Sequence, residues 1–490
     1  MSPSERGVVA AGHPLSAEAG ARVLREGGNA VDAALGAMLT SLVAEALLTG
    51  LGAGGYMLVA GGGIEPTLLD FFVQAPTRTG DGSEVELEAV EVSFGDAEQV
   101  FYVGPASCGV YGVPAGVCEA SRRWGTMPLE MLAAPAALLA RDGVALNASQ
   151  AYVAEILVDL LACTPECAAL WAPGGRPLRE GDVLRTPELG EALMRLAREG
   201  AEPFYTGEIA GAVCDWLGAR GGSLRPGDLA DYRAIERTPV EIVYRDRLIL
   251  TNPPPSAGGT LLAYALGLLD RGPTPPSLGA VVAAMAAAQS ERTPEFVDGL
   301  EQDGFLARFL GSRLGSTTHI SVIDSRGCAC SVTCTNGEGS GVVVPGTGIH
   351  LNNVMGELDL NPRGFHQHPA GRRMPSMMAP SVVMRDGQVE LVLGSAGSNR
   401  IRSALLQTIV GVVDRGLPVR EAVQAPRVHF EDDVVFAEPG IDLGELECDT
   451  QLVRFGAINL FFGGVQAVLR RDGQISGAGD PRRGGVAVSA

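Results

Sequence analysis

The sequence predicts an α+β protein in which two β-sheets lie face to face between outer layers of helices, a four-layer αββα sandwich. Two observations support this fold class. The strand patterns at 56–59 and 67–73 are apolar on both faces, as expected for a sheet that is covered on both sides. Strand patterns are also followed by helical patterns twice, before and after residue 317. We therefore expect one intertwined globular unit.

The first part of the chain is expected to be rich in helices. Apolar spacing predicts a helix over 16–27, with Gly27 as its stop, and a second helix over 30–46. Further helical patterns fill much of 113–196 and 201–232, and 240–250 then returns to a strand pattern.

The second part is expected to start with strands. Strand patterns cover 317–323, 328–335 and 342–344, a hairpin is expected within 381–393, and a helix over 400–414. Three cysteines at 328, 330 and 334 share one face of their strand because side chains alternate along it. We interpret them as small buried apolar residues.

The composition is that of a folded, acidic chain. Hydrophobic residues make up 46% of 490, enough for a sizeable core, and the net charge of −20 with no basic stripe argues against nucleic-acid binding. The longest apolar run, 31–49, is interrupted by Asp32 and Glu45, which favours a buried helix over a membrane span. Nine cysteines, an odd number, favour free thiols.

The N-terminal residues pass quickly into a strand pattern without the basic and apolar regions of an export signal, so we expect cytoplasmic localisation. No phosphate-binding loop, dinucleotide fingerprint or zinc signature is present, and we expect neither a cofactor nor a metal. His366-Gln367-His368 lacks a third ligand at motif spacing and is interpreted as a polar loop.

One stretch, 315–324, contains a complete two-part catalyst. Thr317 heads an alternating strand after a short run of small residues. If the chain is cut before Thr317, that residue holds a hydroxyl nucleophile and a free α-amine with a pKa near ~8, which can act as its general base. Taken alone, Ser-Thr-Thr-His before a strand is an ordinary strand start. The surrounding sequence has to decide between the two interpretations.

Six further motifs accompany the threonine stretch. They are AAGHPL at 10–15, GGNAVDAA at 27–34, GAGGY at 52–56, PPPSAGG at 253–259, LNN at 351–353 and GSAGSNRI at 394–401. In this order the motifs resemble the γ-glutamyltranspeptidase family of N-terminal-nucleophile hydrolases over nearly the whole chain. The resemblance implies autocleavage between Ser316 and Thr317. The products, a large segment 1–316 and a small segment 317–490, would remain partners in one fold.

The resemblance also implies catalytic roles for other residues. Thr335 occupies the position of a threonine that supports the nucleophile, and Asn336 follows it as a substrate-binding residue. Gly397 and Ser398 match two residues whose backbone N–H groups face the developing oxyanion. Backbone donors do not depend on the side chain, so Ser398 in place of the usual glycine is compatible with this role.

The expected recognition pocket departs from the family pattern. Relatives bind the substrate α-carboxylate with an arginine, which is Phe72 here, and with a serine pair, which is Ser376-Met377 here. Glu357 matches the acidic residue that holds the substrate amine. We therefore expect retained chemistry with altered acyl specificity. A replacement carboxylate contact is left open at three arginines, Arg372, Arg373 and Arg400.

These observations predict an autoprocessing acyl hydrolase or transferase, made as a zymogen, that acts on a small amino-acid-derived amide. A nucleic-acid or membrane partner is not expected, and a homo-oligomer is left open. One alternative is a true glutathione hydrolase and γ-glutamyltransferase. Another is an enzyme of secondary metabolism, such as antibiotic biosynthesis, that removes an acyl unit by cleaving an amide or a C–C bond. A third is an uncleaved relative that binds a ligand without catalysis.

Overall fold

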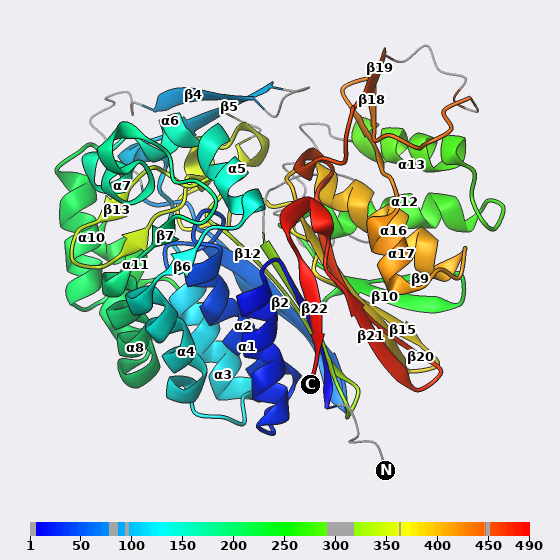
Figure 1. The fold of residues 1–490 in the computed structure, drawn as a ribbon, viewed down its shortest axis with the longest axis horizontal. Helices are drawn as coiled ribbons and strands as arrows, with labels where there is room; N and C mark the ends of the chain where they lie inside the picture. The colour runs from blue at the N-terminus through cyan, green and yellow to red at the C-terminus, as the bar shows by residue number, and fades with distance from the viewer. Residues whose placement is uncertain are drawn as a thin grey trace.

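Two antiparallel sheets packed face to face organise the molecule (Figure 1). The computed structural model describes residues 6–77, 87–93, 98–291, 318–361, 364–444, 446 and 451–490. Helices α1 to α4 lie outside the first sheet, and α12, α13, α16 and α17 lie outside the second (Figure 1). The predicted αββα sandwich is confirmed.

The first sheet contains strands from both sides of residue 317. Its order is β22 (Val486–Ser489), β1 (Gly7–Ala11), β11 (Thr318–Asp324), β12 (Cys328–Thr335), β2 (Gly54–Gly61), β3 (Ile64–Phe71) and β8 (Ile235–Arg237). β11 lies between β1 and β12, with Val9 opposite Val322 and Thr318 opposite Cys334. Main-chain hydrogen bonds therefore join the two segments through the middle of the sheet.

The second sheet also mixes the two segments. Its order is β21 (Gln474–Ala478), β20 (Gly464–Arg471), β16 (Gln388–Ala396), β15 (Ser381–Arg385), β10 (Arg247–Thr251) and β9 (Val240–Tyr244). The single strand expected over 240–250 is wrong, because β9 and β10 form a hairpin. Its turn residues Arg245 and Asp246 have φ of 48° and 66°. Two consecutive residues in the left-handed region reverse a strand tightly, and an aspartate tolerates this conformation.

The helices that cover the first sheet come from the first half of the chain. The principal ones are α1 (Pro14–Arg25), α2 (Ala30–Ala44), α3 (Val113–Trp124), α4 (Leu129–Asp142) and α8 (Pro187–Glu199). Shorter helices complete this side: α5 (Ala148–Ile156), α6 (Val158–Leu161), α7 (Pro165–Trp171), α9 (Glu202–Tyr205), α10 (Glu208–Gly218) and α11 (Pro226–Ala230). The other layer holds α12 (Ala257–Asp270), α13 (Leu278–Ser290), α16 (Arg400–Val413) and α17 (Val419–Gln424).

Helix α2 is buried along its whole length, which explains its apolar sequence. Asn29 begins it with a capping box in which its side chain and that of Asp32 bond each other's backbone N–H groups. The helix ends at Ala44, two residues before the predicted end, and Glu45 follows as its C-cap. No helix in the described part of the chain is long and apolar enough to span a membrane.

Remaining strands form small accessory sheets. They are β4 (Glu88–Ser93) with β5 (Glu98–Val103), β6 (Val144–Ala145) with β7 (Val183–Leu184), β13 (Val343–Val344) with β14 (Ile349–His350), and β17 (Val428–Glu431), β18 (Val434–Ala437) and β19 (Gln451–Arg454).

The alternation along β12 places its two faces in different cores. Cys328, Cys330 and Cys334 pack in the core between the first sheet and its helices, whereas Ala329 packs between the two sheets. The prediction that the three cysteines share one buried face is confirmed. All eight cysteines in the described residues are free thiols.

Candidate active site

The candidate site is built at the end of the first sheet where β11 begins and β12 ends. Thr318, the first residue of β11, lies opposite Cys334, and Thr335 follows Cys334 as the last residue of β12. The predicted cleavage residues Ser316 and Thr317 lie outside the described residues. Their roles stay predictions, but the position where the chain enters β11 locates the site.

A buried carboxyl group holds the start of β11. Glu45 accepts hydrogen bonds from the hydroxyls of Thr318 at 2.8 Å and Ser16 at 2.9 Å. A methyl group added at Gly12 would clash with this carboxyl group. Burial raises the pKa of Glu45, and the two hydroxyl donors partly oppose that shift. In the sequence, Glu45 stands out only as an interruption of an apolar run, and that interruption was the available signal.

A tight glycine turn brings Thr335 and Glu357 together. The Thr335 hydroxyl accepts a hydrogen bond from the backbone N–H of Gly337 at 2.7 Å. Gly337 has φ +67°, and a side chain there would clash with the Glu357 carboxyl group. Between them Asn336 is fully buried, and its carbonyl accepts the backbone N–H of Asn353 at 3.0 Å. Three of the predicted site residues therefore lie in one cluster.

The predicted oxyanion pair lies in the connection from β16 to α16. Gly397 and Ser398 both have positive φ, +119° and 54°. Their carbonyls accept the N–H groups of Arg400 and Ile401 in the first turn of α16, at 3.0 and 3.1 Å. The pair thus starts a helix. Its role in stabilising an oxyanion stays a prediction.

Two adjoining cavities lie at this end of the molecule. The first contains about 630 Å³ of space free of protein atoms, its mouth included, and is lined by Glu45, Arg483 and apolar side chains such as Val43, Leu47 and Trp171. The second contains about 420 Å³ by the same measure, and its lining includes Glu338, Gly397, Ser398, Arg400 and Arg483. Leu48, Val153, Leu460 and Arg483 line both. The second cavity therefore connects the predicted oxyanion pair to the first.

The positions expected to bind a substrate carboxylate hold core residues. Phe72 is fully buried between the sheets and stacks on Tyr56, with ring centroids 5.4 Å apart. Met377 is fully buried in the core between the second sheet and its helices. The Ser376 hydroxyl accepts the backbone N–H of Met378 at 3.0 Å. None of these three residues lines either of the two cavities.

Of the three arginines left open as replacements, one reaches a cavity. Arg373 is buried against Asp70 at 3.2 Å and lies over the ring of Tyr232, and Arg372 is exposed. Arg400 is buried, lines the second cavity, and donates from Nε to the Phe461 carbonyl at 3.1 Å. Arg400 is therefore not a surface residue, and its guanidinium group already donates a hydrogen bond within the protein.

His319 is a neutral part of the inter-sheet packing. Its Nδ1 contacts the Thr333 hydroxyl at 2.7 Å and its Nε2 contacts the Ser321 hydroxyl at 2.9 Å. Burial lowers the pKa of His319 to about 3. His368 lies elsewhere, with Nε2 at 2.9 Å from the Arg373 carbonyl oxygen. Within the described ranges no three potential ligands cluster as a metal site would require.

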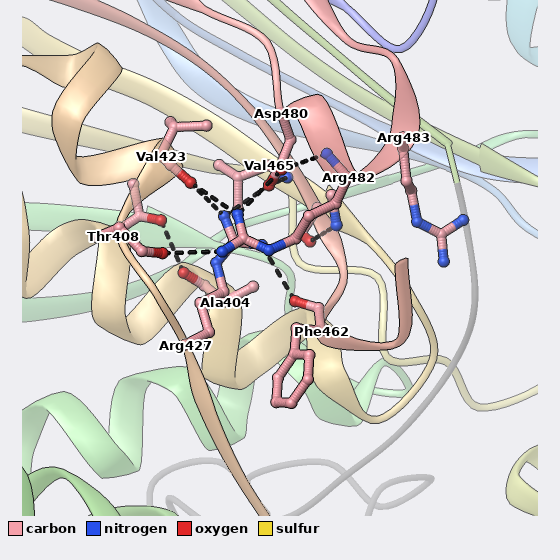
Figure 2. Close-up of polar contacts among 12 residues, drawn as sticks. Ala404, Thr408, Val423, Arg427, Phe462, Val465, Asp480, Arg482 and Arg483 are labelled. Atoms are coloured by element: carbon pink, nitrogen blue, oxygen red, sulfur yellow. Dashed lines mark hydrogen bonds and ion pairs between the residues drawn. The ribbon is translucent and has the colours of Figure 1, made fainter. Parts of the chain in front are cut away.

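Next to the cavities, a buried ionic network holds the C-terminal part of the chain. Arg427 bonds Asp480 at 2.6 Å, and Arg482 bonds Asp480 at 3.1 Å (Figure 2). Arg482 also bonds Glu438. The side chain of Arg483 points away from this network (Figure 2). No sequence motif marks Arg483, and it was not among the predicted site residues.

The sandwich and the residues gathered at this sheet end define the class of N-terminal-nucleophile hydrolases. The γ-glutamyltranspeptidase family model matches residues 16–303 and 307–490, and the chain belongs to this family. It is an enzyme of the hydrolase and acyltransferase type found there.

Similar proteins include both acylases and glutathione hydrolases. The acylase ACY 1 proenzyme of Pseudomonas sp. (strain V22) is 31% identical, over 99% of this chain and 93% of its own. The glutathione hydrolase proenzyme of Escherichia coli (strain K12) is also 31% identical, over 98% of this chain and 91% of its own. The crystal structure of cephalosporin acylase from Bacillus halodurans superposes with a TM-score of 0.84 at 25% identity, covering 99% of this chain and 96% of that one.

Proposed function

We propose that the protein cuts itself between Ser316 and Thr317 and then uses Thr317 to remove an acyl group, other than γ-glutamyl, from a small amino-acid-derived amide. The observation that carries this proposal is the arrangement at the sheet end. Thr318 starts β11 beside Thr335, and a cavity lined by Gly397 and Ser398 opens at the same end of the molecule. Family membership supplies the reaction type.

In the first step of the proposed mechanism, the Thr317 hydroxyl attacks the Ser316 carbonyl carbon. The peptide C–N bond breaks as an ester forms, and the proton of the hydroxyl passes to the released amine. Water then hydrolyses the ester and leaves Thr317 with a free α-amine. Hydrogen bonds across both sheets keep the two segments together after this cut.

In the second step the α-amine takes the hydroxyl proton as Thr317 attacks the substrate amide. The backbone N–H groups of Gly397 and Ser398 stabilise the tetrahedral oxyanion, by roughly 3 kcal/mol each if they resemble other acyl-transfer sites. The leaving amine accepts the proton, and an acyl ester on Thr317 remains. Water or a second amine completes the reaction. Thr335 supports the nucleophile from the end of β12.

The buried positions of Phe72 and Met377 support a changed acyl specificity. A charge-assisted hydrogen bond contributes on the order of 1.5 to 3 kcal/mol, so its absence lowers selection of a glutamyl carboxylate roughly ten- to a hundredfold. The names acylase and cephalosporin acylase among the similar proteins also favour another acyl group. Glutathione hydrolysis is the second candidate, favoured by the equal identity to the Escherichia coli enzyme.

Action inside the cell, in the biosynthesis of a secondary metabolite such as an antibiotic, is part of this proposal. The free thiols of all eight described cysteines suit a reducing compartment. Cell fractionation and metabolite profiling of a deletion strain would test the two statements separately.

Mass spectrometry of the purified protein tests the central claim. Wild type should yield two fragments, one ending at Ser316 and one beginning at Thr317, whereas Thr317→Ala should stay as one chain. Thr206→Ala, at the exposed end of α9, is the matched control and should be cut normally. Incubation with acylated amino acids should add the acyl mass to the fragment beginning at Thr317. An active protein that remains one chain, or an adduct on another residue, contradicts the proposal.

A chromogenic γ-glutamyl anilide separates the two candidate functions. Turnover at least tenfold slower than that of a neutral acyl anilide is expected. If the γ-glutamyl compound is instead the preferred substrate, the glutathione hydrolase function is correct.

A further inference from the structure

The two cavities share an arginine without an acidic contact partner. Three arginines line them: Arg400, Arg482 and Arg483. Arg400 has Glu431 at 4.0 Å, and Arg482 bonds Glu438 and Asp480. Arg483 has no carboxylate within 4.0 Å among the described residues. The chain has 57 acidic and 37 basic side chains, so carboxylates outnumber the cations available to pair with them. An arginine that lines a cavity without an ion pair can therefore take its counter-charge from a bound anion.

The hydrogen bonds of Arg483 are also incomplete. Its Nη2 lies 3.5 Å from the Leu460 carbonyl oxygen, the one hydrogen bond it makes within the described ranges. Its Nε is buried without a hydrogen-bond partner there. A guanidinium group presents five N–H donors in a planar fork, and a carboxylate can accept two of them at once. The group thus retains the donors that an anionic ligand requires.

Glycines rather than acids hold the side chain in place. A methyl group added at Gly464 would lie 2.5 Å from Cδ of Arg483, and one added at Gly397 would lie 3.4 Å from its Nη2. The stem of Arg483 therefore runs along backbone that has no side chains. The guanidinium group lies directly beside Gly397, one of the two predicted oxyanion donors.

The neighbouring arginine shows that this arrangement is specific to Arg483. Arg482 points into the network with Arg427 and Asp480, whereas Arg483 extends to the opposite side (Figure 2). Burial lowers the pKa of Arg483, Arg400 lowers it further, and the more distant carboxylates of Glu338, Asp480 and Glu45 partly oppose that shift. The net effect disfavours the charged guanidinium group, and an anion bound in direct contact would relieve that effect.

We infer that Arg483 binds an anion in the cavity beside Gly397 and Ser398, and that the ligand of this enzyme carries a carboxylate attached to an apolar group. The apolar group would occupy the first cavity, where Val43, Leu47 and Trp171 line the wall. The inference rests on the proposed site of acyl transfer. It adds a substrate class, and it assigns carboxylate binding to Arg483. The positions that bind the carboxylate in relatives hold Phe72 and Met377 here, whose side chains offer no hydrogen-bond donor.

Calorimetric titration with a matched pair of ligands tests the inference without requiring turnover. The probes are 4-phenylbutyrate and its neutral analogue 4-phenylbutyramide, added to the purified wild-type protein. The acid should bind about tenfold or more tightly than the amide, as expected for a charge-assisted contact. Arg483→Gln should abolish this preference. Arg420→Gln, which removes an exposed charge on α17, should leave it unchanged.

The possible results separate this inference from the proposed function. Equal binding of acid and amide by wild type, or a preference that survives in Arg483→Gln, overturns the inference even if the chain cuts itself and forms acyl adducts. Selective acid binding by a chain that never cuts itself overturns the proposed function instead. Should Arg483→Gln fail to fold, Arg483→Lys is tested in its place, because lysine keeps the positive charge but lacks the planar guanidinium group that bonds a carboxylate through two N–H donors. A reduced preference is then expected, and an unchanged one overturns the inference.

Two substrates locate the carboxylate. In N-glutaryl-4-nitroanilide the carboxylate belongs to the acyl group, and in N-pentanoyl-4-aminobenzoate it belongs to the leaving amine. One of them should be cleaved with a higher kcat/KM than its neutral counterpart, N-pentanoyl-4-nitroanilide or N-pentanoylaniline. Arg483→Gln should lower kcat/KM about tenfold for that substrate and leave the neutral compounds unaffected. If neither charged compound exceeds its neutral counterpart, the inference is wrong.

Discussion

Replacing Phe72 by arginine should destabilise the protein and fail to create γ-glutamyl specificity. Phe72 is fully buried between the sheets and stacked on Tyr56. Removing a buried phenylalanine side chain usually costs roughly 3 to 5 kcal/mol, and an unpaired buried guanidinium adds to that. Asp70, which accepts the backbone N–H of Phe72, already bonds Arg237 at 2.7 Å and Arg373 at 3.2 Å. A third arginine would therefore have no acidic partner there.

The comparison variant for this prediction is Phe72→Leu, which keeps the site apolar and removes only part of the side chain, so it should cost less than the roughly 3 to 5 kcal/mol of full truncation. A chain of 490 residues exceeds the size for which two-state unfolding is usual, so apparent midpoints of thermal and urea unfolding are the measurements to compare. The midpoints should fall much further for Phe72→Arg than for Phe72→Leu.

Turnover of a γ-glutamyl anilide provides the functional measurement for the same variants. It should be no faster in Phe72→Arg than in Phe72→Leu, because position 72 does not line either cavity. If Phe72→Arg melts like wild type and cleaves the anilide at least tenfold faster, position 72 faces the substrate and our placement of the pocket is wrong.

Two further predictions concern buried titratable groups. Glu45→Gln should slow self-cleavage about tenfold, because the Thr318 and Ser16 hydroxyls donate to different oxygens of Glu45 and an amide group has only one acceptor oxygen. The fragments are followed by gel over time, with exposed Glu191→Gln as control, and equal rates would contradict the role. Acidification from pH 7.5 to 5.5 should lower the melting midpoint. Burial lowers the pKa values of His13, His350 and His429 to about 4 and that of His319 to about 3. Below pH 6.5 the unfolded state binds more protons than the folded state, so each buried histidine removes about 1.4 kcal/mol of stability per pH unit until its folded pKa is reached. A midpoint that stays constant over this range would contradict the burial of these rings.

Much of the fold could be predicted because the strands are apolar and bounded by turn residues. The expected strand over 328–335 agrees with β12 at both ends, and the expected helix from 400 agrees with the start of α16. The sequence was ambiguous where a continuous strand pattern contained a turn, as at Arg245 and Asp246. Only these two residues adopt the left-handed conformation that forms the turn. The strand pattern is present on both sides of them, so the sequence predicts one strand.

Part of the candidate site could be predicted where a motif resembles the family. The resemblance selected Thr335, Gly397, Ser398 and Glu357, and the structure places Thr335 beside Glu357 and the other two on a cavity at the same end of the molecule. Glu45 and Arg483 were not identified as site residues. Each is placed by contacts with residues far away in the chain, and their local sequence contains no recurring pattern.

The sequence by itself determined the family, the reaction class and the order of the layers, since these follow from short motifs and from apolar periodicity. Only the tertiary structure decided which side chains face the cavities. A strand that is apolar on both faces does not reveal whether Phe72 points toward substrate or toward Tyr56. Likewise, Arg482 and Arg483 are neighbours in the sequence and both line a cavity, but Arg482 pairs with Glu438 and Asp480, whereas packing against Gly397 and Gly464 places Arg483 beside the predicted oxyanion pair.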